Sequence, residues 1–338
     1  MQTNLKKAQI GKTGLEVTRI GMGGAPIGKG DIDIAVESLE TAYREGIRYF
    51  DTAPLYGTGR SEIFYGNFLP TISRDDFTLS TKVGRLLLSE DDASKFSYPE
   101  SVDLESDVFN INNRSAKYKN QVVFNYSRDG ILRSIDESLS RLGLDRIDIV
   151  LIHDPDDFYD QALNESFPTL ADLKSQGVIK AIGAGMNEWE MLSEFAKNAD
   201  FDCFLLAGRY TLLDHSALHE LMPLCEEKGI SLILGGPYNS GILASDLDSE
   251  TTYFYEASPN EIVRKAQAIK KVCDQFNVPL KAAALQFGLN HPTVAATIPG
   301  PTNANELKEN IKMATFEINP DLWSELKNEG LIHQDCPS

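Results

Sequence analysis

A helix, a glycine and a short apolar strand recur along the chain, and this repeat constrains the fold more than any other feature. The predicted amphipathic helices are Ile34–Glu45, Asp129–Leu142, Ser166–Gln176 and Ser216–Lys228, each followed by Gly46, Gly143, Gly177 or Gly229. Glycine just past a helix is typical of a left-handed C-terminal cap. Because the intervening strands are almost continuously apolar, they indicate a parallel sheet that is covered on both faces.

The same pattern predicts eight strands. They are Thr18–Gly23, Arg48–Asp51, Thr78–Lys82, Ile147–His153, Ile179–Ala184, Cys203–Gly208, Ser231–Gly235 and Val294–Pro299. Eight parallel strands with intervening helices predict an α/β protein of the (β/α)8 TIM-barrel type. Since no linker divides the 338 residues, we expect a single barrel domain over 1–338. A doubly wound sheet is the alternative, and it is disfavoured because GMGGAPIGKG lacks the G-x-G-x-x-G spacing.

Three segments fall outside the repeat. Ala8–Val17 predicts an N-terminal β-hairpin that plugs the bottom of the barrel. Ser89–Asn125 is a long polar loop after the third strand, and Thr251–Ser258 is an aromatic loop after the seventh. Loops that follow barrel strands lie at the C-terminal face, where barrel enzymes bind substrate. We therefore expect these two loops to set substrate specificity.

Composition excludes several classes of function. The net charge of −18 argues against binding to nucleic acid or to an anionic membrane, both of which need basic patches. The longest apolar runs, such as Ile147–Ile152, are too short to cross a bilayer, and because the first residues contain no apolar run we expect no secretory signal. The four cysteines form no CxxC and no Cys/His cluster of zinc spacing, so we expect free thiols, no metal and a cytoplasmic protein.

Four chemically active side chains fall at the ends of neighbouring strands. Asp51, Lys82 and His153 each end a short apolar run, and Tyr56 follows Asp51 in the next loop. Any one of them alone has an ordinary explanation as a helix cap or a buried polar residue. If the runs are adjacent parallel strands, all four side chains converge at the mouth of the barrel. We therefore predict a single catalytic group formed by Asp51, Tyr56, Lys82 and His153.

These residue types suit proton transfer coupled to hydride transfer. Tyrosine has an ordinary pKa near 10, and a nearby ammonium favours its anion. We expect Lys82 to lower the pKa of Tyr56, Asp51 to hold Lys82 in place, and His153 to donate a hydrogen bond to a substrate oxygen. Such a group protonates a carbonyl oxygen or deprotonates an alcohol while hydride moves at carbon.

Four motifs in order resemble the aldo-keto reductase family, over about residues 9–331. FDTAPLYGTGRSE resembles a family signature, LSTKVG and IHDPD carry the matching lysine and histidine, and IPGPTNANELKENI resembles the cofactor clamp. The resemblance implies a barrel without metal that binds NAD or NADP across its mouth. It implies that Tyr56 is the acid/base, that Lys82 and Asp51 tune it, and that His153 orients the substrate.

The resemblance also implies a set of cofactor-binding positions. They are Asn187, Gly236, Tyr238, Ser240, Gly241, Glu306, Glu309 and Asn310. Ala207 and Gly235 stand where the family places a glutamine and an aromatic residue. For Glu309 and Asn310 the alternative is a solvated helix face. Since Gly300–Leu307 contains no basic residue and Glu306 can accept from a ribose hydroxyl, we expect NAD rather than NADP.

A narrower resemblance concerns the segments GAGMNEWEML, FLLAGRYTLLD and GGPYNSGIL, which are similar to the aldose 1-dehydrogenase branch of the family. It implies oxidation of the anomeric carbon of a free, neutral sugar (L-fucose, L-galactose or D-arabinose type) to a lactone. A general aldehyde reductase and a pyridoxal 4-dehydrogenase are alternatives within the family. A regulatory subunit that binds cofactor without turnover is a third, and the complete catalytic group disfavours it. Oligomeric state is left open.

Overall fold

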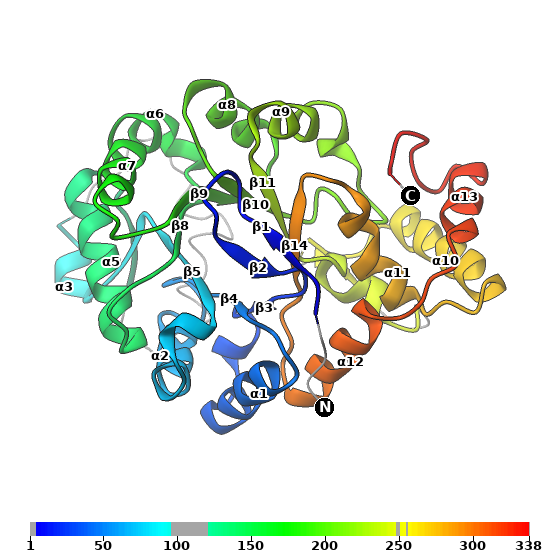
Figure 1. Cartoon of the computed structure of the whole chain (residues 1–338), viewed down its shortest axis with the longest axis horizontal. Helices are drawn as coiled ribbons and strands as arrows, with labels where there is room; N and C mark the ends of the chain where they lie inside the picture. The colour runs from blue at the N-terminus through cyan, green and yellow to red at the C-terminus, as the bar shows by residue number, and fades with distance from the viewer. Residues whose placement is uncertain (1–4, 96–120, 248–250, 255, 338) are drawn as a thin grey trace.

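The computed structural model describes residues 5–95, 121–247, 251–254 and 256–337, and a ring of parallel strands surrounded by helices dominates it (Figure 1). Within these ranges, eight parallel strands form one sheet in the order β14-β11-β10-β9-β8-β5-β4-β3. Their bounds are β3 (Met22–Gly23), β4 (Tyr49–Asp51), β5 (Thr78–Val83), β8 (Ile149–His153), β9 (Ala181–Met186), β10 (Cys203–Ala207), β11 (Ser231–Gly235) and β14 (Val294–Ile298). The predicted α/β barrel is therefore confirmed.

The sheet closes on itself next to its first strand. Ile20, just before β3, forms a parallel bridge with Thr297 of β14. The amide of Gly21 donates to the Thr297 carbonyl at 2.9 Å, and the Thr297 amide donates to the Arg19 carbonyl at 2.9 Å. The predicted strand Thr18–Gly23 is thus longer than the observed one, because Thr18 ends the N-terminal hairpin and the segment that follows joins the two edges of the barrel.

Helices cover the outside of the barrel. The main ones are α1 (Ile32–Arg44), α2 (Arg60–Gly66), α5 (Arg128–Leu142), α7 (Phe167–Ser175), α8 (Glu190–Asn198), α9 (Leu221–Lys228), α10 (Asn260–Gln275), α11 (Leu280–Phe287), α12 (Ala304–Ala314) and α13 (Asp321–Asn328), with short α3 (Glu90–Ala93) and α6 (Tyr159–Gln161). None of the helices within the described ranges has the length and apolar character needed to span a membrane.

The glycines predicted to end the helices adopt the left-handed conformation. Gly46, Gly143, Gly177 and Gly229 have φ values of 103°, 62°, 75° and 71°, as expected for C-terminal caps. One predicted helix is wrong in extent. Ser216–Lys228 divides into a short 3₁₀ segment, η6 (Ser216–Leu218), and helix α9, so that His219 lies between two helical segments instead of inside one.

The N-terminal hairpin closes the bottom of the barrel. Strands β1 (Lys7–Gln9) and β2 (Glu16–Thr18) pair antiparallel, and Figure 1 shows them across the centre of the ring. Ile10 and Val17 are buried in the same cluster as residues of the barrel interior. The amide of Gly11 donates to the Ser231 hydroxyl at 2.8 Å, at the start of β11. Since strands start at this end, the hairpin lies opposite the end of the barrel where the predicted catalytic residues stand.

The two predicted loops contain short strands. The end of Ser89–Asn125 forms β7 (Gln121–Phe124), which pairs antiparallel with β6 (Arg85–Leu88), so the prediction of an all-loop segment is wrong there. Val122 and Val123 are buried, which explains why these residues form a strand. Residues 96–120 lie outside the described residues. Thr251–Ser258 contains the pair β12 (Thr252–Tyr253) and β13 (Glu256–Ala257).

Candidate active site

Alternation along the strands directs the predicted catalytic side chains into the mouth of the barrel. Ile149 and Leu151 of β8 belong to the interior cluster, whereas Val150 and Ile152 pack outward against the helices. By the two-residue period of a strand, His153 continues the inward row. The same period on β4 and β5 places Asp51 and Lys82 inward. These three strands are neighbours in the sheet, so their last inward residues meet.

Lys82 and Asp51 form a fully buried ion pair. The Lys82 ammonium lies 2.8 Å from Oδ2 and 3.1 Å from Oδ1 of Asp51, and both side chains are 1% exposed. It also donates to the Thr52 carbonyl at 3.0 Å. Asp51 in turn accepts from the Ser80 hydroxyl at 2.7 Å. Burial favours a neutral amine, but the carboxylate outweighs it and the pKa of Lys82 is raised, so the site keeps a fixed cation.

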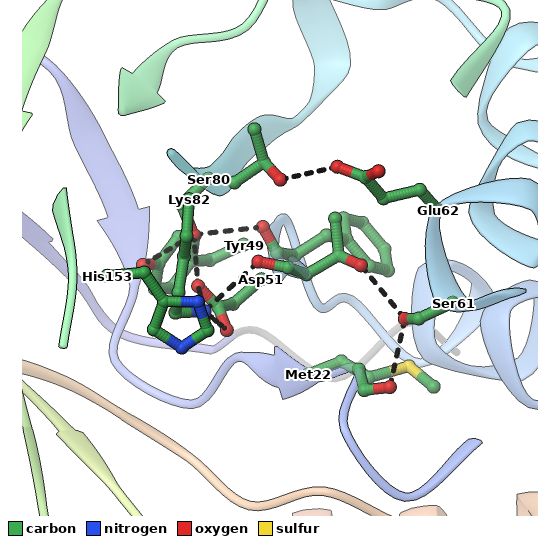
Figure 2. Close-up of polar contacts among 12 residues, drawn as sticks. Met22, Tyr49, Asp51, Ser61, Glu62, Ser80, Lys82 and His153 are labelled. Atoms are coloured by element: carbon green, nitrogen blue, oxygen red, sulfur yellow. Dashed lines mark hydrogen bonds and ion pairs between the residues drawn. The ribbon is translucent and has the colours of Figure 1, made fainter. Parts of the chain in front are cut away.

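Figure 2 shows this pair beside the imidazole of His153, with Ser61 and Glu62 approaching from α2. Glu62 is fully buried and accepts from the Thr81 hydroxyl at 2.7 Å and from Arg141 at 2.6 Å. Thr81 faces away from the barrel interior, between Ser80 and Lys82. The Glu62 contacts therefore fix strand β5 from the outside, while Lys82 stays free to point inward.

Tyr56 lies in the loop after β4, against both the lysine and the histidine. Its ring centre is 4.5 Å from the Lys82 ammonium and 5.9 Å from the His153 ring, which it meets edge-on at 90°. Burial raises the pKa of Tyr56 to about 12, against the opposing effect of the Lys82 cation. Lys82 does lower the pKa of Tyr56, as expected, but the expected net decrease is wrong, because the loss of solvation outweighs the cation. At neutral pH Tyr56 is a phenol, ready to donate a proton.

His153 is a neutral imidazole at neutral pH. Burial, followed by the charges of Arg85 and Lys82, holds its pKa well below the ordinary value. Its Nε2 lies 3.5 Å from Oδ2 of Asp154. Its buried Nδ1 has no hydrogen-bond partner among the described residues. Nε2 of His153 therefore faces a carboxylate, whereas the buried Nδ1 has hydrogen-bonding capacity that the described residues do not use.

Asp154 and Arg85 belong to this site, although sequence reasoning missed them. Arg85 is 1% exposed and donates to Oδ2 of Asp154 at 2.8 Å. Burial raises the pKa of Asp154 to about 6, against the opposing charge of Arg85. The Asp154 backbone has a φ of 37°, an uncommon conformation for a residue with a side chain. An arginine three residues after Lys82 and an aspartate directly after His153 were the signals available.

Tyr126 holds the backbone of this corner in place. Its hydroxyl donates to the carbonyls of His153, at 2.5 Å, and of Asp154, at 2.9 Å. A side chain at Gly84 would collide with the Tyr126 ring, since a Cβ there would lie 2.1 Å from it. Glycine at position 84 (φ 99°) therefore lets the tyrosine approach the end of β8. The hydrogen bonds from Tyr126 therefore hold the backbone of His153 in position.

Small residues end three strands on the side of the barrel next to Lys82. Gly185, Ala207 and Gly235 take the last inward positions of β9, β10 and β11. A Cβ at Gly185 would lie 3.5 Å from Cε of Lys82, and one at Gly235 would lie 3.1 Å from Leu205. Bulkier residues would fill this half of the mouth. Ala207 and Gly235 are the positions at which the family has a glutamine and an aromatic residue, so contacts to a nicotinamide here stay a prediction.

The loop after β11 has the backbone of an anion-binding turn. Gly236, Asn239, Ser240 and Gly241 have φ values of 57°, 46°, 59° and 104°. Residues of this kind make concave rows of amides that bind phosphate groups. Asn239 is buried, with Nδ2 donating to the Gly208 carbonyl at 3.3 Å and Oδ1 without a partner among the described residues. The backbone of this loop is therefore compatible with the predicted dinucleotide contacts, and Asn239, which the sequence did not suggest, has a side-chain oxygen that no described residue uses.

The structure connects this loop to one of the two predicted cofactor-binding residues near the middle of α12. The Tyr238 hydroxyl donates to Oδ1 of Asn310 on α12 at 2.8 Å, and Asn310 is buried. Glu309 instead pairs with Lys281 of α11 at 2.9 Å on the surface. Glu309 thus lies on the exposed face of α12 and Asn310 on its buried face, and both stay predicted contacts of the cofactor.

The other two predicted cofactor residues are engaged in local contacts. Glu306 accepts from the amide and the hydroxyl of Thr302, both at 2.8 Å, and so caps the first turn of α12. The carbonyl of Asn187 accepts from Nε of Arg209 at 3.0 Å, which holds the loop after β9. The Asn187 side chain and the Glu306 carboxylate stay predicted contacts of the cofactor.

Known proteins are similar to this chain along almost its whole length. A family model described as "Aldo/keto reductase family" matches residues 19–329. A pyridoxal 4-dehydrogenase from Microbacterium luteolum is 37% identical, with 97% of this chain and 98% of that protein covered. A D-threo-aldose 1-dehydrogenase from a Pseudomonas species is 38% identical, with 94% of this chain and 96% of that protein covered.

Solved structures share the fold. An aldo-keto reductase from Bacillus halodurans in its holo form superimposes with a TM-score of 0.74 at 23% identity, covering 96% of both chains. A glycerol dehydrogenase from Gluconobacter oxydans gives a TM-score of 0.73 at 19% identity, covering 95% of this chain and 94% of the other. At this identity the similarity establishes the architecture, so the chemistry must be argued from the side chains at the mouth.

Proposed function

The chain belongs to the aldo/keto reductase family, and we propose that within it the protein is an aldose 1-dehydrogenase that oxidises the anomeric carbon of a free sugar to a lactone. It is an NAD(P)-dependent oxidoreductase. The observation that carries the proposal is the 38% identity to a D-threo-aldose 1-dehydrogenase along almost the whole of both chains. The phenol, imidazole and buried ion pair at the mouth supply the chemistry that this reaction needs.

The side chains divide the work of proton transfer. Tyr56 exchanges a proton with the anomeric oxygen: its phenolate accepts the proton during lactone formation, and its hydroxyl donates the proton during reduction. His153, held neutral, hydrogen-bonds the same oxygen and orients it. Lys82, fixed by Asp51, stabilises negative charge on the Tyr56 oxygen whenever the proton has left. The nicotinamide, when bound, takes up or supplies the hydride at carbon.

The chain's residues favour a particular cofactor. Gly300–Leu307 offers no cation to a 2′-phosphate, and Glu306 would repel one, so we propose NAD as the preferred cofactor. Asn187, Asn239 and the loop Gly236–Gly241 would hold it, together with Asn310.

Because Tyr56 is protonated at neutral pH, the protein is poised as an acid, and oxidation depends on the small fraction of tyrosinate.

Pyridoxal is a second candidate substrate. The specific observation in its favour is the 37% identity to a pyridoxal 4-dehydrogenase over 97% of this chain. An aldose and pyridoxal share one chemical feature, since each carries a hydroxyl that can close onto its aldehyde to form a cyclic hemiacetal. Oxidation of either ring gives a lactone, so the same four side chains serve both. The surrounding loops decide between them.

The rate of formation of reduced nicotinamide tests the proposal. NAD and then NADP are offered with L-fucose, L-galactose, D-arabinose, pyridoxal and simple alcohols, and initial rates are compared. We expect the highest kcat/KM with NAD and a sugar of the L-fucose type. Activity confined to pyridoxal would select the second candidate. Cofactor binding without turnover of any substrate would contradict both and favour a regulatory subunit.

A further inference from the structure

A cluster of two histidines and one aspartate lies outside the catalytic mouth, near the C-terminal end of the chain. His219 lies between η6 and α9, and His333 and Asp335 belong to the tail after α13. One ligand atom from each of the three lies within 4.8 Å of the others. Spacing rules for zinc sites did not reveal the cluster, because its members come from distant parts of the sequence.

We propose that His219, His333 and Asp335 bind one divalent transition-metal ion of the zinc class. Two imidazole nitrogens and a carboxylate oxygen form a donor set that suits Zn²⁺ and its neighbours, whereas Mg²⁺ and Ca²⁺ require oxygen ligands. Three protein ligands leave a fourth position for water. The cluster is separate from the residues that carry the oxidoreductase reaction.

Distances within the cluster suit shared coordination better than direct pairing. Nδ1 of His219 and Nδ1 of His333 lie 3.9 and 3.6 Å from Oδ2 of Asp335. These separations exceed the usual hydrogen-bond range of about 2.7–3.2 Å. Two ligands of one tetrahedral ion lie about 3.4 Å apart when the metal bonds are near 2.1 Å. The two histidine–aspartate separations exceed this spacing by a few tenths of an ångström, and all three ligand atoms lie within 4.8 Å of one another.

The tail is already anchored in the position that binding requires. Ile332 and Cys336, on either side of the cluster, are 3% and 1% exposed. The Ile332 amide donates to the Leu326 carbonyl at 3.3 Å, and the Gln334 side chain donates to the Lys327 carbonyl at 2.7 Å. Because the backbone is fixed, metal binding needs little ordering of the tail. The imidazoles already meet edge-on, with ring centres 4.6 Å apart.

The three side chains are open to solvent. His219, His333 and Asp335 are 60%, 48% and 68% exposed, so an ion can reach them and keep a water ligand. The net charge of −18 favours cations at the surface. One local bond must yield, since Nδ1 of His333 now accepts from the Asp335 amide at 3.1 Å. A bound ion would hold the tail against the segment that precedes α9.

Calorimetric titration with Zn²⁺ tests the proposal. The protein is used full length, without a polyhistidine tag, after treatment with a chelator that is then removed. We expect one Zn²⁺ per chain and no heat with Mg²⁺. His219→Gln, His333→Gln and Asp335→Asn should each weaken binding by about tenfold or more. Glu329→Gln, which removes an exposed carboxylate near the tail, is the matched control and should bind as the wild type does.

Two further measurements keep the result unambiguous. Excess Zn²⁺ should raise the Tm of the wild type and of Glu329→Gln, but not that of His219→Gln. Co²⁺ should give the visible absorption of a tetrahedral nitrogen and oxygen site, without the charge-transfer band that a thiolate ligand produces. Absence of Zn²⁺ binding, equal binding by all variants, or a cysteine signature with Co²⁺ would overturn the proposal.

Discussion

The Lys82 ammonium lies 2.8 Å from the Asp51 carboxylate, and both groups are removed from solvent at the end of neighbouring strands β4 and β5. Each charge makes the burial of the other tolerable. The pair therefore places a permanent cation beside Tyr56, whose ring centre is 4.5 Å away. The same two residues therefore supply the cation beside Tyr56 and make the burial of both charges at the barrel mouth tolerable.

Removing one partner of this pair should be costly to the fold. Lys82→Met leaves the Asp51 charge buried and unpaired, and we expect the free energy of unfolding to fall by roughly 3–5 kcal/mol. The double variant Asp51→Asn/Lys82→Met should lose less than the sum of the two single losses. Urea unfolding of all four proteins gives the coupling. Strictly additive losses would show that the pair does not act as a unit.

Tyr56→Phe should abolish turnover without unfolding the protein. Removing the hydroxyl removes the proton donor, and we expect kcat to fall by at least about 10²-fold while NAD affinity changes only a few-fold. Tyr43→Phe is the matched control, because that hydroxyl contacts Asp76 on the outside of the barrel. The assignment of Tyr56 is falsified if Tyr56→Phe retains wild-type turnover.

The two directions of the reaction should differ in their pH dependence. Burial raises the pKa of Tyr56 to about 12, so the phenol persists through neutral and moderately alkaline pH. Reduction, which uses the phenol, should be independent of pH in this range. Oxidation, which uses the anion, should accelerate by about tenfold per pH unit below that pKa while chemistry limits the rate. Measured kcat profiles with an apparent pKa near 7 in both directions would contradict this account.

Asp154 should position His153. Asp154→Asn removes the carboxylate that faces Nε2 of His153 and pairs with Arg85. We expect kcat to fall by about tenfold, less than for Tyr56→Phe, with KM for the cofactor unchanged and the pH profile displaced. Asp172→Asn, which removes an exposed surface partner of Arg128, is the control. A loss confined to thermal stability, with unchanged kcat and pH profile, would leave Asp154 a purely structural residue.

Glu306→Arg should shift cofactor preference toward NADP. The arginine would supply the cation that Gly300–Leu307 lacks, and the ratio of kcat/KM for NADP over NAD should rise by about tenfold or more, or about 1.4 kcal/mol. Glu306 also caps α12 through Thr302, so Glu306→Gln is the control that removes charge but retains hydrogen bonding. If neither variant changes the ratio, cofactor choice is decided elsewhere.

Periodic features of the fold were predictable because burial imposes them. Helix caps at Gly46 and Gly143, the barrel strands and the inward direction of Asp51, Lys82 and His153 all follow from local patterns. The hairpin at the barrel bottom also followed. Strand β7 could not be predicted, because a long segment separates it in sequence from its partner β6. The break before α9 could not be predicted either, because the sequence pattern across it is that of one continuous helix.

Parts of the site depend on spatial contacts that the sequence does not contain. The pKa of Tyr56 is set by its burial, which outweighs the neighbouring cation, and a sequence motif does not give burial. Arg85 and Asp154 meet only because β5 and β8 are adjacent. Glu309 turned toward Lys281 and Asn310 toward Tyr238, although they are consecutive residues of one helix. The sequence could identify the chemically active side chains, but only the fold shows which of them are in contact.

The most direct test of the central claim is to identify the product at the anomeric carbon. An aldose of the L-fucose type, isotopically labelled at that carbon, is incubated with NAD and the wild-type protein, and the reaction is followed by NMR. We predict that the label moves from the hemiacetal to the lactone resonance in step with the reduction of NAD, and that Tyr56→Phe leaves it unchanged. Reduction of NAD without a lactone, or an equal yield of lactone with Tyr56→Phe, would contradict the account.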